Sequence, residues 1–176
     1  MRILVPIIQF PPDVNPTGVL MAQLCEGLTA CGHEVSVITT FPHYENFRIW
    51  EEYKGKLVKR DRERGMEIVR LFTYAPGNKS MLNRLISYVT FNGLAAITAG
   101  FSRARWDIIV CTNGSFFTGL TGWLLGKAKN VPFIYKCRIY TRTFPSGQVS
   151  CAIRLPSRHS EASKDSCIAR RPILPL

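Results

Sequence analysis

The chain has 176 residues, 46% of them apolar, which allows one domain of ordinary size with a globular core. It opens MRILVPII without the charged and apolar regions of a secretory signal, and none of its six cysteines form a C-x-x-C pair, so we expect reduced thiols in a cytoplasmic protein; a disulfide framework is the less favoured alternative. The net charge of +11 would suit nucleic acid or an anionic membrane, but more than half of this excess lies in residues 136–176.

The first 39 residues follow a strand–loop–helix–strand pattern. Pro6 falls within the first expected strand, although a central strand needs the N–H that proline lacks. The second expected strand, EVSVIT, alternates apolar and polar residues. The expected elements are a strand at 2–8, a loop at 9–17, a helix at 18–30 and a strand at 34–39.

The expected helix at 18–30 carries its own signals. Leu20, Leu24 and Leu28 recur every four residues, which places them on one helix face. Thr17 is suited to cap the start of the helix, and Gly32 to end it in a left-handed conformation.

Residues 40–56 are aromatic and mixed in charge, and they are predicted to form a long loop over the C-terminal edge of the sheet, where ligands usually enter. Residues 57–73 hold two short strand-like runs around DRERG, which predict a hairpin or a strand with an extended arm. MEIVRLFTY, residues 66–74, is the better strand.

A long helix is predicted over residues 81–101, with Ser80 as its cap. Residues 85–101 carry no charge, yet they fall short of the roughly 20 apolar residues that span a bilayer and include polar residues and glycines. A buried or interfacial helix is therefore favoured over a transmembrane one. The basic residues that flank it and could meet lipid headgroups are Arg84, Arg103 and Arg105.

The remaining pattern completes a parallel sheet covered on both faces. A strand is expected at 106–111, a helix at 116–129 and a strand at 131–135. Residues 136–176 show neither strand nor helix periodicity and are rich in Ser, Arg and Pro. The predicted organisation is a Rossmann-like, doubly wound α/β domain over residues 1–135 with an irregular basic tail.

The loop at 11–18 lies where unpaired N–H groups and a helix dipole attract phosphate. Gly18 would let the backbone approach a ligand closely, so we interpret it as a phosphate-binding residue; the alternative is a turn glycine without a ligand. Asn15 and Thr17 are weaker candidates, which serve equally well as a turn former and a helix cap.

A second ligand-facing loop follows the expected strand at 106–111. Asn113 and Ser115 are candidates there, although a plain helix cap accounts better for Ser115. His43 lies in a loop facing the same edge and is a candidate for an acceptor contact. Asp13 could serve as a base, but nothing in the sequence positions a nucleophile near it, so an ordinary loop residue is the default interpretation. No His, Cys, Asp and Glu have the spacing of a metal site.

Five segments of the chain together resemble the N-terminal half of family 4 glycosyltransferases. They are FPPDVNPTG, GHEVSVIT, FPHY, WDIIVCTNGSFFTG and VPFIY. The resemblance covers residues 1–135 and implies half of the two-domain GT-B architecture, of the type that makes bacterial surface polysaccharides. It implies sugar transfer from a nucleotide-sugar to a saccharide or lipid-linked acceptor, with no cofactor. In the family a glycine that maps onto Gly18 contacts the donor diphosphate, but here Thr17 stands where many members have another glycine.

The resemblance stops at Tyr135. The family usually continues Asn-Val-Gln-Asp-Leu-Tyr-Pro-Asp, whereas this chain continues KCRIYTRT. Back-translation with one base restored near codon 136 recovers the family peptide, and the same shift recovers family-like sequence over residues 167–174. We hypothesise that a one-base deletion left residues 136–176 out of frame, and that the chain is inactive alone because it lacks the second domain, which holds most of the donor.

Two other classes share some of these features. A nicotinamide-dependent oxidoreductase would share the strand–helix opening, but residues 9–18 contain no G-x-G-x-x-G. A nucleic-acid-binding module would use the basic tail, which offers only Tyr140 and Phe144 for base stacking, so no nucleic acid is expected. The expected location is cytoplasmic, with peripheral contact to an anionic membrane at its inner face as an option.

Overall fold

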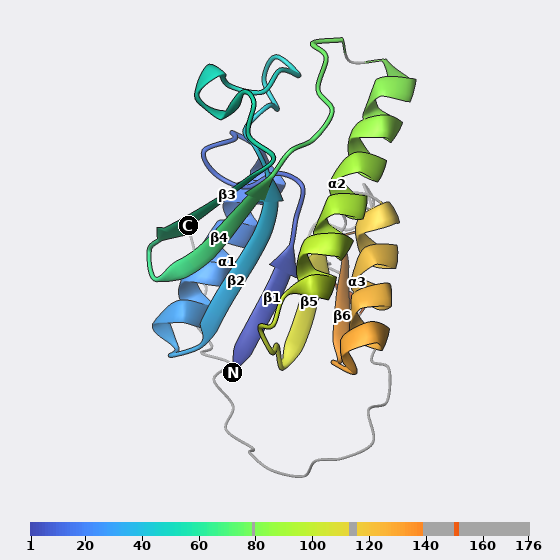
Figure 1. Ribbon diagram of the computed structural model, residues 1–176. Coiled ribbons are helices and arrows are strands. Elements are labelled where there is room, and N and C mark those ends of the chain that lie inside the picture. Colours follow the sequence, from blue (N-terminus) through green and yellow to red (C-terminus); the bar gives the residue numbers. More distant parts are fainter. Residues whose placement is uncertain (79, 113–115, 139–149, 152–176) are drawn as a thin grey trace, which may run out of the picture.

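The computed structural model describes residues 1–78, 80–112, 116–138 and 150–151, which form a sheet packed between helices (Figure 1). In chain order the elements are β1 (Arg2–Pro6), α1 (Pro16–Ala30), β2 (Glu34–Thr40), the 3-10 turn η1 (Glu51–Tyr53), β3 (Val58–Glu63), β4 (Met66–Leu71), α2 (Met81–Phe101), β5 (Ile108–Thr112), α3 (Phe116–Lys129), β6 (Phe133–Arg138) and β7 (Ser150–Cys151).

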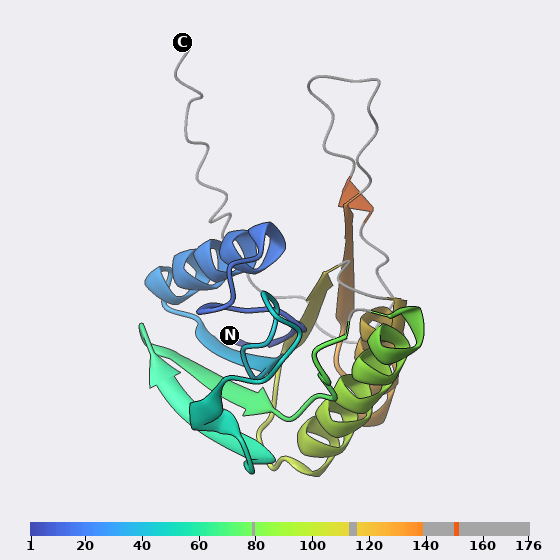
Figure 2. The same ribbon diagram turned by 90° about the horizontal axis from the view of Figure 1, so that it is seen from above.

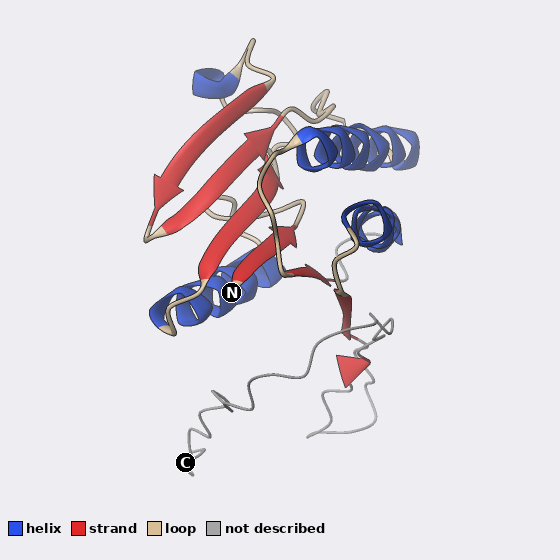
Figure 3. Ribbon diagram, turned by 60° about the horizontal axis from the view of Figure 1, so that its bottom comes forward, coloured by secondary structure: helices blue, strands red, loops and turns tan. Residues whose placement is uncertain are grey.

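The strands lie in the order β3-β4-β2-β1-β5-β6-β7. β1 pairs in parallel with β2 and β5, and β4 and β6 extend the parallel sheet outward. β3 and β7 pair antiparallel at the two edges. α1 covers one face, and α2 and α3 lie side by side on the other (Figures 2 and 3). The predicted doubly wound, Rossmann-like fold is confirmed.

Alternating side chains of the central strands fill two apolar cores, one on each face of the sheet. Leu4 of β1 packs in the core that α2 covers with Phe91, and its neighbour Val5 packs in the core that α1 covers with Met21. β1 ends at Pro6, two residues earlier than expected, although the next N–H, of Ile7, still donates to Ile38. Proline therefore lies at the end of the strand, where its missing N–H is tolerated.

The boundaries of α1 correct one expectation and confirm another. The helix begins at Pro16, and the cap is Asn15, whose side-chain oxygen accepts from the backbone N–H of Thr17. Thr17 is thus inside the first turn, where proline at the preceding position is already preorganised for a helix. At the other end Gly32 has φ +80°, and the N–H of His33 donates to Leu28, which is the predicted left-handed stop.

The buried face of α1 differs from the one marked by its leucines. Leu20 and Leu24 are exposed, and the residues that pack on the sheet are Gly18, Met21, Ala22 and Cys25. The small residues among them let the helix axis approach the sheet closely. The leucine spacing predicted the helix, but of the three leucines only Leu28 packs against the core.

β3 and β4 form the hairpin predicted around DRERG. Their register pairs Glu63 with Met66, which leaves Arg64 and Gly65 as a two-residue loop. Both loop residues have positive φ, 51° and 80°, as a turn that matches the twist of a hairpin requires. Glycine reaches this conformation without strain, so the sequence signal and the turn agree.

α2 begins after Ser80, whose hydroxyl accepts from the N–H of Asn83, as expected. Among the described residues, none of the helices is both long and apolar enough to cross a membrane.

The end of the described sheet extends beyond the expected boundary at residue 135. β6 begins at Phe133 and runs to Arg138, and β7 pairs with it. Residues 139–149 and 152–176 lie outside the described residues, so the irregular tail stays a prediction.

Two of the described cysteines are shielded from reaction. Burial raises the pKa of Cys111 to about 12. The pKa of Cys25 is also raised to about 12, mainly by burial and to a smaller extent by the charge of Glu26. Cys31 is exposed. Since a shift of three units lowers the thiolate fraction about a thousandfold, iodoacetamide should label Cys31 long before the other two.

Mass spectrometry of the labelled peptides measures this order directly. In urea the three cysteines should react at similar rates. Equal rates in the native protein would contradict the two buried positions.

Candidate functional site

Loops that follow the parallel strands meet at one edge of the sheet. Residues 7–15 follow β1, residues 41–57 follow β2, and residues 72–78 follow β4, and all three lie above the carboxyl ends of the strands (Figure 1). In open α/β sheets ligands bind outside these carboxyl ends. This edge is therefore the candidate site, as the sequence indicated for the first two loops.

Asp13 joins the first two loops. It is 4% exposed, and its Oδ1 accepts from the backbone N–H groups of His43 and Tyr44, each at 3.1 Å. Its Oδ2 accepts from His43 as well, at 3.2 Å. The interpretation of Asp13 as an ordinary loop residue was wrong, because its carboxyl group holds the β1 and β2 loops together. The local sequence does not reveal that these two loops meet.

The side chain of His43 is enclosed rather than directed into solvent. It is 3% exposed, and its Nδ1 lies 2.8 Å from the carbonyl oxygen of Phe41. A carbonyl oxygen only accepts, so Nδ1 carries the proton and donates. Nδ1 also lies 3.3 Å from the hydroxyl of Thr40, which itself donates to Ile8 in the β1 loop. His43 therefore stabilises the loop arrangement, and its acceptor contact stays a prediction.

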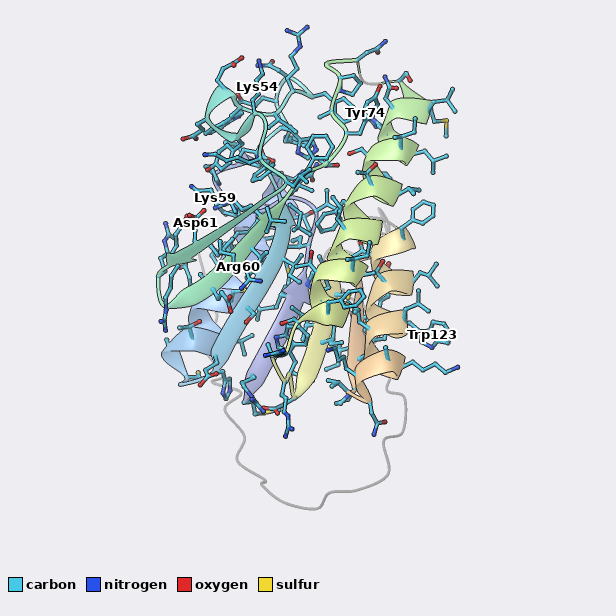
Figure 4. All side chains as sticks on the ribbon, in the orientation of Figure 1. Lys54, Lys59, Arg60, Asp61, Tyr74 and Trp123 are labelled. Atoms are coloured by element: carbon cyan, nitrogen blue, oxygen red, sulfur yellow. The ribbon has the colours of Figure 1, made fainter. Side chains whose placement is uncertain are left out.

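Arg70 supports the same arrangement from β4. Its side chain is 1% exposed, and its Nη2 donates to the carbonyl oxygen of Pro11 at 3.0 Å and to Glu63 at 3.3 Å. Its Nε lies 3.5 Å from a carboxyl oxygen of Asp61 on β3, labelled in Figure 4. Among the described residues Nε and Nη1 make no hydrogen bond. No local pattern indicated that this charge would be buried beneath the first loop.

Gly18 meets a backbone group rather than open space. A Cβ at this position would lie 2.7 Å from the carbonyl oxygen of Gln9. Glycine is therefore required here so that the start of α1 can pack against the loop that precedes it. This observation supports a packing role for Gly18, and its contact with a donor phosphate stays a prediction.

The amides at the start of α1 are only partly available to an anion. Asn15 already accepts from the N–H of Thr17 at 2.8 Å. Asn15 therefore acts as the helix cap, and the N–H group of Thr17 is already bonded to this cap. Asn113 and Ser115, the candidates in the second loop, lie outside the described residues.

Exposed aromatic side chains lie on the loops of this edge. Tyr44 and Trp50 belong to the loop after β2, and Tyr74 to the loop after β4 (Figure 4); they are 39%, 41% and 39% exposed. Such rings can cover the apolar face of a sugar while a polar group stays in water. In the sequence, only the aromatic character of residues 40–56 indicated exposed rings at this edge. Tyr74 was missed because the expected strand at 66–74 included it, whereas β4 ends at Leu71.

A hollow of about 470 Å³ lies elsewhere, at the amino ends of β2 and β4. It carries both signs of charge, and the hydroxyl of Ser36 donates to Glu67 across it at 3.4 Å. The described residues contain no cluster of His, Cys, Asp and Glu that could hold a metal ion. The loops at the carboxyl ends thus stay the better candidate. The lining residues of the hollow are His33, Glu34, Val35, Ser36, Arg60, Asp61, Arg62, Gly65 and Glu67.

The sequence pattern of the glycosyl transferase 4-like domain matches residues 17–164, most of the chain. The chain belongs to this family. The match extends past residue 135, where the resemblance was expected to stop.

Similarity to known proteins supports the assignment to this family. A protein of Escherichia coli (strain K12), named for glycosyl transfer in colanic acid biosynthesis (WcaI), is 32% identical over 106 residues, or 60% of this chain and 26% of that protein. Two solved structures share the fold at 16% and 17% identity: sucrose-phosphate synthase from Thermosynechococcus elongatus, with a TM-score of 0.54, and the catalytic domain of starch synthase IV from Arabidopsis thaliana bound to ADP and acarbose, with 0.56. Each alignment covers 78% of this chain and 33% of the other.

The chain thus spans about a quarter of the length of its curated relative and a third of the length of these solved structures. Its fold is that of the N-terminal domain of the GT-B architecture, as the resemblance implied. The loops joined by Asp13 lie at the edge that such a sheet offers to ligands.

Proposed function

We propose that this domain serves sugar transfer from a nucleotide-sugar to a saccharide or lipid-linked acceptor in the synthesis of a surface polysaccharide. The observation that carries the proposal is the loop edge in a chain of this family: two loops held by Asp13, with Tyr44, Trp50 and Tyr74 exposed beside them. The domain would supply the acceptor side of the cleft. A second domain would hold most of the nucleotide.

On the donor side, the proposal keeps Gly18, Asn15 and Thr17 near the diphosphate, together with Asn113 and Ser115 from the second loop. The contact would be made by backbone N–H groups, because a glycine presents no side chain and a helix start favours negative charge. The packing of Gly18 on Gln9 fixes where those N–H groups lie. No metal or cofactor is part of the proposal.

The proposal includes the hypothesis that the reading frame changes near codon 136 and that the chain is inactive alone. Catalysis of this kind needs two preorganised halves around the donor, because positioning supplies much of the rate enhancement. The gene sequence across codon 136 tests the frame. Codons that cannot yield Asn-Val-Gln-Asp-Leu-Tyr-Pro-Asp after one base is restored would remove the hypothesis.

Activity is tested on the frame-restored gene. Its product should hydrolyse one donor, or transfer the sugar from it, in a panel of UDP-glucose, UDP-galactose, GDP-mannose and GDP-fucose. The present chain should do neither. A frame-restored protein that binds none of these donors would count against the proposal. No observation favours the alternative of a nucleic-acid-binding module.

The aromatic side chains give a prediction that separates the two substrates. In the active, frame-restored protein, Tyr74→Ala should raise the KM for acceptor about fivefold and leave the rate of donor hydrolysis within about twofold, because loss of one stacked ring removes roughly 1 kcal/mol. Phe101→Ala is the control, since Phe101 is 87% exposed at the far end of α2. An unchanged acceptor KM in the tyrosine variant would exclude Tyr74 from the acceptor site.

A lipid-linked acceptor would bring the protein to the inner face of the cytoplasmic membrane. We therefore propose a cytoplasmic location with peripheral membrane contact. The support is chemical: a lipid-linked substrate stays in the bilayer, so the cleft must approach its surface.

A further inference from the structure

The loops after β2 and β4 meet in a short antiparallel contact at the carboxyl edge of the sheet. Arg48 and Pro76 form an isolated bridge, and the backbone N–H of Gly77 donates to the carbonyl oxygen of Phe47 at 2.6 Å. Because proline has no N–H, Arg48 and Pro76 form the type of antiparallel pair that shares no hydrogen bond and brings its side chains close together. The bridge thus fixes which side chains of the two loops are neighbours.

This register also brings two aromatic residues together. Two residues farther along each loop it places Trp50 opposite Tyr74, on the same side as Arg48. Exposure alternates along both loops as this pairing requires: Phe47 is buried and Arg48 exposed, and Thr73 is buried and Tyr74 exposed. The backbone of Trp50 is extended, with φ −59° and ψ 146°. The outward side of the two loops therefore carries one cation beside two exposed rings.

Arg48 is held in place from its inner side. Gly77 has φ +88°, and a Cβ built on it would lie 2.5 Å from Nε of Arg48. The arginine side chain therefore lies along a stretch of backbone that only glycine provides. The preceding residue, Phe47, is 8% exposed and packs edge-on against the ring of His43, whose backbone N–H is bonded to Asp13. Arg48 is thus attached to the same joined loops that form the candidate site.

The cation and both rings are available to a ligand. Among the described residues, the guanidinium of Arg48 makes no ion pair or hydrogen bond, whereas Lys54 in the same loop pairs with Glu51. In that same part of the chain, the rings of Trp50 and Tyr74 contact no other ring and no cation. An anion that binds Arg48 would therefore displace no existing ion pair.

We propose that Arg48, Trp50 and Tyr74 form a subsite for an acidic sugar of the acceptor, which we name the acidic-sugar subsite. The rings would cover the apolar face of a pyranose, and the guanidinium would pair with a carboxylate or phosphate carried by that sugar. Arginine suits this role because its planar fork matches two oxygens of either anion. The inference rests on the proposed function, since it takes the loop edge as the acceptor side, and it adds that the acceptor is negatively charged there.

Three sugars with the same ring test the charge directly. Methyl β-glucoside, methyl β-glucuronide and methyl β-glucoside 6-phosphate differ in carrying a hydroxymethyl group, a carboxylate or a phosphate. Binding to the full chain is followed by tryptophan emission. Trp50→Phe keeps a ring at the subsite and should abolish the signal, which separates Trp50 from the other two tryptophans of the chain.

At least one anionic sugar should bind about tenfold more tightly than the neutral glucoside. A preference for the glucuronide alone identifies a carboxylate as the source of the charge, a preference for the phosphate alone identifies a phosphate, and either supports the acidic-sugar subsite. Equal affinities for the three sugars, or binding of none of them, would overturn it.

A matched pair of variants assigns the preference to one cation. Arg48→Gln should weaken binding of the preferred anionic sugar about tenfold and leave binding of the glucoside within about twofold. Arg103→Gln removes an exposed cation beyond the end of α2 and should bind all three sugars as the wild type does. Arg48→Lys should recover part of the affinity, because it keeps the charge without the planar fork. Equal weakening for all three sugars in Arg48→Gln would refute recognition of the anion by Arg48.

Failure of this inference can be distinguished from failure of the proposed function. A frame-restored protein that binds a nucleotide-sugar but shows no preference among the three sugars would keep the proposed function and lose the acidic-sugar subsite. A protein that prefers an anionic sugar through Arg48 but binds no nucleotide-sugar would keep the subsite as a saccharide-binding surface and lose the transfer reaction.

Discussion

Asp13→Ala is expected to lower the free energy of unfolding by about 3 kcal/mol, because it leaves the buried N–H group of His43 and the partly buried N–H group of Tyr44 without an acceptor. Urea denaturation followed by far-UV circular dichroism measures the change. The loss should exceed that of an exposed carboxyl group. Asp107→Ala is the control, and its surface pair with Arg2 should contribute no more than about 1 kcal/mol.

Asp13→Asn separates the hydrogen bonds from simple packing. The single oxygen Oδ1 accepts from both N–H groups, so an asparagine Oδ1 at the same place keeps a hydrogen bond to each. The asparagine variant should therefore lose less than half as much stability as the alanine variant. Equal losses would show that the joining of the two loops does not depend on these acceptors.

In the active, frame-restored protein, Asp13→Asn should retain more transfer activity than Asp13→Ala at temperatures where both are folded. The reason is positional: Asp13 is enclosed, so it acts through the loops it holds rather than on a substrate. Donor and acceptor KM values, measured separately, would show which side of the cleft the two loops shape.

Gly18→Ala is the second substitution with a large expected effect. Alanine is a better helix former than glycine by about 1 kcal/mol, yet its Cβ would lie 2.7 Å from the carbonyl oxygen of Gln9. Two backbone segments must separate to admit it, and we expect a net destabilisation of about 1–3 kcal/mol, measured by denaturation.

Gly27→Ala in the same helix is the matched control. Nothing lies within 4 Å of a Cβ built there, so this substitution should stabilise the protein by up to about 1 kcal/mol. The same chemical change in one helix is thus expected to have opposite signs. A stabilised Gly18→Ala protein would contradict the close packing of α1 on the preceding loop.

The chain order of strands and helices could be predicted from the sequence, because the signals are local. Gly32 and Ser80 act at the positions expected of them, and the turn at Arg64 and Gly65 follows from neighbouring residues. The parallel arrangement also follows, because strands joined through helices pair in parallel. The error at the start of α1 is of the same local kind: Asn15, two residues before Thr17, is the cap.

The candidate site was predictable only as a region. Its place at the carboxyl ends of the strands follows from topology, and Gly18, Asn15, Thr17 and His43 all lie there. Their roles depend on contacts between distant segments, such as Asp13 with His43, which are 30 residues apart. A local pattern cannot reveal such a pair, and so the sequence suggested a ligand contact for His43 where the structure shows an enclosed side chain.

The sequence by itself thus determined the α/β organisation, the helix ends and the resemblance to family 4 glycosyltransferases, since these depend on short-range periodicity and turn residues. Only the tertiary structure decided which side of each helix is buried. α1 packs through small residues and leaves Leu20 and Leu24 in solvent, and α2 turns Ser87 and Asn92 inward and Ile86 outward. The physical reason is that burial is set by the partners a helix meets across the fold, and hydrophobicity counted along one helix does not identify those partners.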